Sequence, residues 1–94
     1  MIVVAAIVTI IEGKEDEYEQ KLKSLTSKVL NDPGTIKYII HRMIDNPTKF
    51  FFYEQYENDE ALKFHSSAPH FKEMFGAMKP FLDGKPEIYM YSEI

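Results

Sequence analysis

Two side chains of this sequence are candidates for proton transfer, and His65 is the first. An imidazole has an ordinary pKa of about 6.5, so it exchanges a proton readily near neutral pH. His65 is expected at the end of a short helix, directly before an interruption that contains Pro69. A histidine there could act as a base. The alternative is structural, because a helix-terminal histidine can also cap carbonyl groups or pack against Tyr and Phe rings.

Glu54 is the second candidate, because it lies in an otherwise aromatic run at residues 50–56. It shares its side of the predicted strand with two phenylalanines and Tyr56. A carboxylate in such surroundings is strongly disfavoured unless it is paired or protonated, and a raised pKa would make it a usable base. The alternative is that Glu54 accepts a backbone N–H or pairs with Arg42 on the adjacent strand.

The other two histidines are weaker candidates for proton transfer. His70 is expected in the first turn of a helix, where the dipole disfavours an imidazolium, so we interpret it as a neutral hydrogen-bonding or surface residue. His41 is expected to be exposed near a strand end. The separation of His65 and His70 across a proline break matches no recognised metal-ligand spacing, so no metal site is predicted.

Other kinds of catalytic machinery find no support in the sequence. There are no cysteines, which excludes a thiol nucleophile, a disulfide scaffold and any Cys-ligated metal or iron–sulfur centre. The four glycines form no G-x-G phosphate loop, and no G-x-S-x-G motif is present. The sequence therefore predicts no cofactor.

The composition predicts one small globular domain. The chain has 94 residues, of which 45% are hydrophobic and 28% are charged. Its net charge of −4 argues against a nucleic-acid partner, which needs a basic surface. The first apolar run, Ile2–Ile11, has no basic segment before it and is too short to span a membrane, which takes about 20 residues. We therefore expect a cytoplasmic protein without a membrane contact.

Hydrophobic periodicity predicts elements in the order β-α-β-β-α-β. Apolar residues recur at helical steps from Tyr18 to Val29, and Pro33-Gly34 stops that helix. The expected strands are residues 2–11, 35–44, 50–56 and 87–94, and the expected helices are 15–30, 60–65 and 68–82. This order predicts an α+β, ferredoxin-like fold with the helices on one face of a four-stranded antiparallel sheet.

The predicted sheet has too few helices to cover it. The first three strands carry apolar residues at both odd and even positions, which point to opposite faces of the sheet, whereas the helices can shield only one face. An apolar face of this size exceeds the few hundred Å² that soluble monomers usually expose. We expect a two-fold homodimer whose sheets pack face to face; the alternative is a monomer with a twisted, partly exposed sheet.

Two segments resemble the antibiotic biosynthesis monooxygenase (ABM) family. Residues 52–71 combine an aromatic-Glu strand, an acidic helix start with Ala-Leu, then His65, a break of small residues and His70-Phe71. Residues 32–38 resemble the Pro-Gly turn that enters the family's second strand. The resemblance covers nearly the whole chain and implies the dimeric α+β barrel fold.

The resemblance implies several activities. Some members oxidise quinols or polycyclic phenols with O₂ and no cofactor, some degrade haem, and close relatives isomerise a phosphorylated product of the autoinducer-2 signal. The haem degraders resemble one another in a pocket Asn, Trp and His, at positions held here by Ala6, His65 and Phe75, and this chain has no Trp. Haem degradation is therefore not expected. Glu54, His65 and Phe71 occupy positions shared with the other two branches.

We expect base-assisted oxidation of a small quinol or phenol by O₂. His65 takes a phenolic proton, and Glu54 orients the imidazole or accepts a second proton. The expected catalytic residues are His65 and Glu54, and the expected substrate-binding residues are Phe71, Phe75, Tyr56 and His41.

Two alternatives stay open at this point. In an isomerase, His65 would shuttle a proton next to a carbonyl, and a phosphorylated substrate would need cationic partners. The same fold also serves non-catalytic ligand-binding and stress-response modules, because a fold does not fix a function. A closed pocket that holds His65 and Glu54 together would favour an enzyme.

Overall fold

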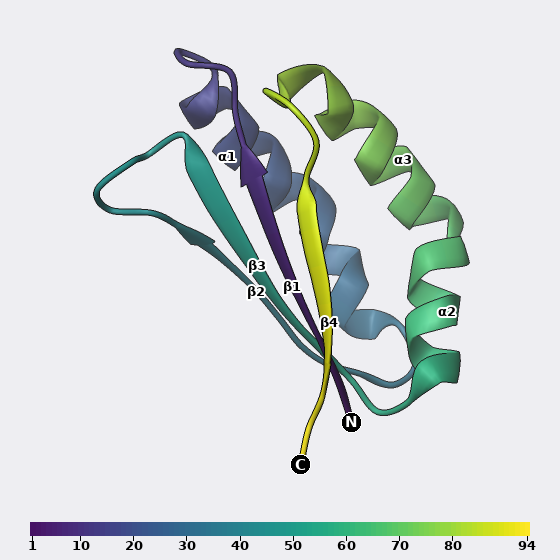
Figure 1. Cartoon of the computed structure of the whole chain (residues 1–94). Coiled ribbons are helices and arrows are strands. Elements are labelled where there is room, and N and C mark those ends of the chain that lie inside the picture. Colours follow the sequence, from purple (N-terminus) through teal and green to yellow (C-terminus); the bar gives the residue numbers. More distant parts are fainter.

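A four-stranded sheet forms one layer of the molecule and the helices form the other, as the computed structural model of residues 1–94 shows (Figure 1). The strands are β1 (Ile2–Thr9), β2 (Thr35–Arg42), β3 (Lys49–Tyr56) and β4 (Glu87–Ser92). The helices are α1 (Glu15–Leu25), α2 (Asp59–Ser67) and α3 (Pro69–Met78), with two 3₁₀ helices, η1 (Thr26–Asn31) and η2 (Lys79–Phe81). The predicted element order and the ferredoxin-like α+β arrangement are confirmed.

The sheet register decides which side chains face the helices. All neighbouring strands are antiparallel, in the order β2-β3-β1-β4. Tyr38 on β2 pairs with Glu54 on β3, which also pairs with Val4 on β1. Val4 packs with Ala61 of α2 in a small buried cluster, so this row of the sheet faces the helices. Tyr38 and Glu54 are therefore neighbours on the covered face.

The first helix ends earlier than the periodicity predicts. The α-helical part stops at Leu25, and the chain continues as the tighter η1 to Asn31. The Thr26 hydroxyl donates to the Leu22 carbonyl oxygen at 2.7 Å, a local bond that competes with regular helix geometry. The apolar stripe still faces inward, since Leu22 and Val29 are both buried.

The main core fills the space between the sheet and helices α1 and α3. Burying a side chain such as Leu22 stabilises the fold by about 1.5–3 kcal/mol. Tyr18 meets Phe50 edge-on, with ring centroids 4.9 Å apart, and this contact holds α1 against β3. The buried members of this core are Val8, Ile10, Tyr18, Leu22, Phe50, Phe52, Met74, Met78 and Phe81.

The turn after η1 lies against α2 because Gly34 allows a close approach. Gly34 has a φ of +79°, and a Cβ atom there would stand 2.5 Å from the Cβ of Ala61. The side chain of Asn58 caps α2 by accepting the Ala61 backbone N–H at 2.9 Å. Ala61 and His65 are one helical turn apart on the same face, so this contact also brings Asp32 toward His65.

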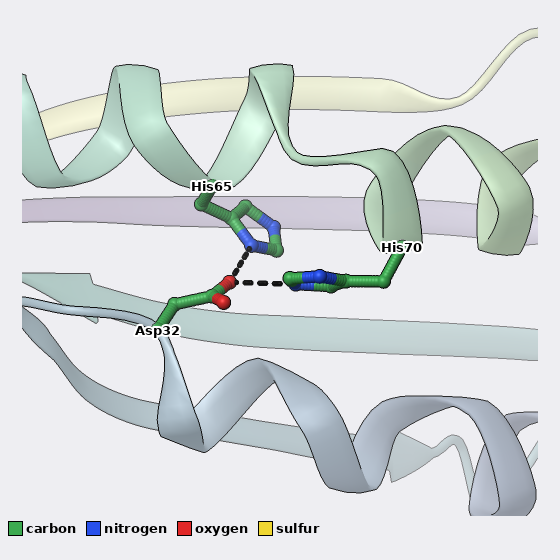
Figure 2. Close-up of side chains that lie close together, drawn as sticks. All are labelled: Asp32, His65 and His70. Carbon is green, nitrogen blue, oxygen red and sulfur yellow. Dashed lines mark hydrogen bonds and ion pairs between the residues drawn. The ribbon is translucent and has the colours of Figure 1, made fainter.

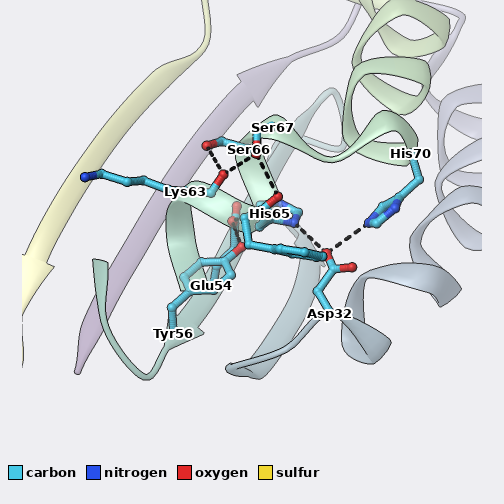
Figure 3. A network of polar contacts seen from close by, with 9 residues as sticks. Asp32, Glu54, Tyr56, Lys63, His65, Ser66, Ser67 and His70 are labelled. Carbon is cyan, nitrogen blue, oxygen red and sulfur yellow. Dashed lines mark hydrogen bonds and ion pairs between the residues drawn. The ribbon is translucent and has the colours of Figure 1, made fainter. Parts of the chain in front are cut away.

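One extended residue separates α2 from α3. Ala68 has φ −65° and ψ 142°, and Pro69 takes the first position of α3, one residue after the expected start at residue 68. The hydroxyls of Ser66 and Ser67 donate to the Lys63 carbonyl oxygen at 3.2 and 2.7 Å (Figure 3). These bonds extend α2 two residues beyond the predicted end at His65 and fix the direction in which the chain leaves it.

The second face of the sheet carries no helix (Figure 1). Ile39, Tyr89 and Tyr91 lie on that face by register and are 46%, 48% and 54% exposed. Every residue of β4 is exposed. The predicted pairing of two sheets remains a prediction. None of the helices combines the length and the apolar character that crossing a membrane requires.

Candidate functional site

Three side chains from separate parts of the chain converge beside the break between α2 and α3 (Figure 2). His65, in the last turn of α2, places Nδ1 3.2 Å from Oδ2 of Asp32. His70, in the first turn of α3, places Nε2 2.9 Å from the same oxygen. Asp32 is the C-cap of η1, so its carboxylate connects the η1–β2 turn to both helices.

Aromatic rings enclose the imidazole of His65. The ring centroids of Phe71, Tyr56 and Tyr38 lie 5.0, 5.4 and 5.8 Å from it. Burial lowers the pKa of His65, because desolvation disfavours the imidazolium, and the hydrogen bond to Asp32 opposes this effect. A neutral ring at pH 7 keeps one nitrogen free to accept a proton.

Glu54 lies on the other side of that imidazole (Figure 3). Its Oε1 is 3.9 Å from Nε2 of His65 and accepts a hydrogen bond from the Tyr56 hydroxyl at 2.6 Å. Burial raises the pKa of Glu54, while the Tyr56 bond acts in the opposite direction. Burial and the neighbouring Glu54 charge also raise the pKa of Tyr38. The site therefore contains a carboxyl group with enhanced basicity beside an imidazole.

An apolar cavity of about 120 Å³ adjoins Glu54. Phe71 and Phe75 are among its walls, together with Tyr38, and Lys79 is the single cation in its lining. His65 is absent from the lining, so Glu54 is the carboxylate that meets the cavity, and His65 stands behind it. The remaining walls are Ala6, Val8, Tyr18, Leu22, Phe52, Met74, Met78, Leu82, Pro86 and Ile88.

The other predicted site residues lie outside this cavity. Tyr56 is fully buried and contacts Glu54, where it positions the carboxylate. His41 is exposed on the open face of the sheet, with Nδ1 3.3 Å from the Phe51 carbonyl oxygen. The structure thus brings His65, Glu54, Tyr56, Phe71 and Phe75 together and leaves His41 apart.

The alternative pairing of Glu54 with Arg42 is wrong. Arg42 lies opposite Phe50 in the register, four residues along β3 from Glu54. Its guanidinium instead donates to Asp16 and Glu19 of α1, at 2.9 and 3.3 Å. Glu54 is consequently buried without a cationic partner on the adjacent strand.

Asp32 is the residue that the sequence analysis overlooked. In the sequence it precedes Pro33-Gly34, where an aspartate is the usual turn residue, so its type carries no separate signal. Only the packing of Gly34 on Ala61 reveals that the carboxylate points at His65. Asp32 is 7% exposed and His65 2%, which distinguishes this contact from a surface ion pair.

Comparison with known proteins identifies the family. The family model described as antibiotic biosynthesis monooxygenase matches residues 1–77. This chain belongs to that family. The matched segment of the ABM domain includes Asp32, Glu54, His65 and Phe75, whereas Lys79 lies beyond it.

Individual relatives extend this result. A curated isomerase from Salmonella paratyphi B, which acts on (4S)-4-hydroxy-5-phosphonooxypentane-2,3-dione by its name, is 29% identical over 55 residues. The alignment covers 58% of this ABM chain and 57% of that relative, so it spans little more than half of either protein.

Solved structures match over almost the entire chain. A protein from Caulobacter crescentus CB15, provisionally named as an antibiotic biosynthesis monooxygenase, is 30% identical with a TM-score of 0.92, covering 99% of this chain and 89% of that one. A conserved protein from Methanosarcina mazei Go1 is 29% identical with a TM-score of 0.92, covering 99% and 92%. The ABM fold therefore accounts for the whole chain.

Proposed function

We propose that this ABM-family protein oxidises a small quinol or phenol with O₂. The observation that carries the proposal is the apolar cavity with a buried carboxylate, Glu54, in its wall. Apolar protein cavities on the order of 150 Å³ bind benzene, so a cavity of about 120 Å³ suits a single aromatic ring. Phe71 and Phe75 offer the ring apolar walls.

The chemistry begins with removal of a phenolic proton by Glu54, whose basicity is increased by burial. A ring carbon of the resulting anion bonds to O₂, and the proton held by Glu54 passes to the peroxide, which becomes a ring hydroperoxide. Glu54 then removes the hydrogen of that ring carbon, the new carbonyl group forms as the O–O bond breaks, and the departing hydroxide takes this proton and leaves as water. One hydroquinone and one O₂ give one hydroxybenzoquinone and one water. The substrate loses four electrons and O₂ gains four, so the substrate is the only reductant required.

His65 supports Glu54 in this scheme. Its Nε2 faces Oε1 of Glu54 at 3.9 Å, within reach of a proton after a small closure. Asp32 holds the opposite nitrogen of the ring, which fixes the tautomer with its free lone pair toward Glu54. This assignment exchanges the roles expected from the sequence, because Glu54 meets the cavity and His65 acts from behind it.

An oxygen-electrode assay of the purified protein with hydroquinones and catechols tests the proposal. We expect one O₂ consumed per quinol, and a loss of rate of about 10²–10⁴-fold in Glu54→Gln, which keeps the acceptor for Tyr56. His65→Ala is expected to lower kcat more than it changes KM. Glu57→Gln, an exposed carboxylate directly after the end of β3, is the matched control. Wild-type protein that consumes no O₂ with any quinol or catechol would contradict the proposal.

Isomerisation of a phosphorylated diketone is a second candidate. It is favoured by the name of the curated relatives and by Lys79, a cation in the cavity lining that could meet a phosphate. The apolar walls and the buried Glu54 disfavour a dianion, which is why we rank it second. Turnover of such a substrate without O₂, lost in Lys79→Gln, would support isomerisation and count against oxidation.

We also propose that two chains associate through the open face of the sheet. The support is the row of exposed apolar side chains that includes Ile39 and Tyr89. We expect a dimer by light scattering at micromolar concentration, converted to monomer by Ile39→Asp. Ile44→Asp is the control, because Ile44 is 95% exposed but follows the end of β2. A wild-type monomer at that concentration would contradict the proposal.

A further inference from the structure

We propose that Asp32, His65 and His70 form a binding site for one divalent transition-metal ion such as Zn²⁺. The three ligand atoms lie within 4.8 Å of one another and come from η1, α2 and α3 (Figure 2). Two imidazoles and a carboxylate are a familiar ligand set for such ions. The site goes beyond the proposed oxidation and does not depend on it.

The distances between the ligand atoms suit an ion. Zinc binds nitrogen and oxygen at about 2.0–2.2 Å, so adjacent ligand atoms around a tetrahedral ion stand about 3.3–3.6 Å apart. Oδ2 of Asp32 is 3.2 Å from Nδ1 of His65 and 2.9 Å from Nε2 of His70, so an ion would move these atoms apart by only about 0.1–0.7 Å. The three ligand atoms lie within 4.8 Å of one another, so the two imidazole nitrogens need to approach each other by at most about 1.5 Å to bind one ion.

The number of protons that the His65 ring carries gives a second argument for a bound cation. This buried ring stands between two carboxylates, Asp32 at Nδ1 and Glu54 at Nε2. A neutral imidazole carries one proton, so it can serve only one of the two. An ion on Nδ1 would reverse the tautomer of the metal-free protein and leave the ring proton on Nε2, pointing at Glu54. A ligand histidine that donates its other N–H to a carboxylate is the usual outer arrangement of protein metal sites.

Access and selectivity also follow from the surroundings. His70 is 24% exposed at its side chain, whereas His65 and Asp32 are 3% and 5% exposed. An ion can therefore enter beside His70 and complete its coordination there with water. The imidazole ligands favour Zn²⁺, Co²⁺ or Fe²⁺ over Mg²⁺ and Ca²⁺, which prefer oxygen. A bound ion would join the turn at Asp32 to both helices.

Titration of EDTA-treated protein with ZnCl₂ by calorimetry tests the site directly. We expect one ion per chain, and an affinity at least tenfold weaker in His70→Gln, whose partly exposed position allows the variant to fold. His41→Gln removes an exposed histidine from outside the cluster and is the matched control. It should bind like the wild type. Asp32→Asn, which removes the charge and keeps the shape, should also weaken binding.

Two further measurements distinguish specific metal binding at this cluster from nonspecific binding at the protein surface. CoCl₂ should give a visible absorption band in the wild type and in His41→Gln, and none in His70→Gln. ZnCl₂ should raise the unfolding temperature of the same two proteins and not that of His70→Gln. Absence of saturable binding, or binding that His70→Gln leaves intact, would overturn the proposal and leave Asp32 as a hydrogen-bond acceptor alone. Neither readout uses the quinol reaction, so the two proposals can fail separately.

Discussion

Two clusters of charged side chains connect distant segments of this fold, and they differ in their contact with water. Asp32 meets His70 at 2.9 Å, and Asp16 meets Arg42 at the same distance. The side chain of Asp32 is 5% exposed, whereas that of Asp16 is 91% exposed. Water screens the Asp16 pair, so that pair contributes little to stability. The buried cluster comprises Asp32, His65, His70 and Glu54. Water cannot replace a lost partner there, so each polar group depends on its neighbours.

The comparison teaches that distance alone does not rank polar contacts. Hydrogen bonding to Asp16 raises the pKa of Arg42, which stays charged in either state. In the buried cluster, desolvation lowers the pKa of His65 and raises that of Glu54, so charge is disfavoured on both. The protonation of the buried cluster is therefore governed by burial, while the exposed cluster serves only to link α1 with β2.

Removal of one carboxylate from each cluster should give the largest difference in the free energy of unfolding. Asp32→Ala leaves the N–H groups of His65 and His70 without their acceptor in a buried place. We expect the free energy of unfolding to fall by about 3 kcal/mol. Asp16→Ala should change it by no more than about 0.5 kcal/mol. Urea denaturation in EDTA measures both, and equal losses would contradict the contrast.

The turn that carries Asp32 can be broken without touching a charge. Gly34→Ala puts a Cβ against Ala61 at a positive φ, so both a clash and backbone strain result. We expect a loss of about 2–3 kcal/mol by urea denaturation. Gly13→Ala is the matched control, because Gly13 has φ +92° and open space around it, and should lose only about 1–2 kcal/mol. A Gly34→Ala loss no larger than that of Gly13→Ala would remove the close approach as a cause.

The pH dependence of stability should come from the buried cluster in the metal-free protein. Burial lowers the pKa of His65 below 6.5, so its stabilising contribution is complete above pH 6.5 and is lost as the pH falls through the folded pKa. Burial raises the pKa of Glu54 above 4.5, so its contribution is complete below pH 4.5 and is lost as the pH rises through the folded pKa.

Variants separate these two opposite dependences. Unfolding curves from pH 4 to pH 8 should show less loss on acidification in His65→Gln than in the wild type. Glu54→Gln should gain stability relative to the wild type as the pH rises from 4 to 7. Glu19→Gln, in the exposed cluster, is the comparison variant. Parallel curves for all four proteins would show that the buried groups titrate normally.

The smallest expected effect belongs to the exposed cluster. Arg42→Gln removes the contacts with Asp16 and Glu19, which water and salt already weaken. We expect a slight fall of the thermal midpoint at low ionic strength that disappears in 0.5 M NaCl. A large fall that persists in salt would show that Arg42 stabilises the fold by its packing over the Phe50 ring, 5.5 Å from the guanidinium carbon.

Much of the fold could be predicted because hydrophobic period and turn residues agree along the chain. Pro33-Gly34 marks the end of the first helical segment, and Pro69 marks the start of α3. The periodicity could not reveal the change to 3₁₀ geometry after Leu25, because buried positions recur at nearly the same steps in both helix types. Element order was therefore more predictable than element ends.

Two carboxylates of the site differ in how far the sequence could predict them. Glu54 could be found because a carboxylate in an aromatic strand is out of place. Asp32 could not, because an aspartate before Pro-Gly fits its local turn and its partners lie 33 and 38 residues away. The sequence could not predict which of His65 and Glu54 lines the cavity, since this depends on how α2 lies over β3.

The interruption at Ala68 determines which way two rings point. In an uninterrupted α-helix, side chains five residues apart diverge by about 140° and stand about 7.5 Å apart along the axis. His65 and His70 have that separation in sequence, yet both meet Oδ2 of Asp32. Inserting or deleting a single residue between them would turn one imidazole away from Asp32. The length of this link therefore decides whether the two imidazoles and the carboxylate meet.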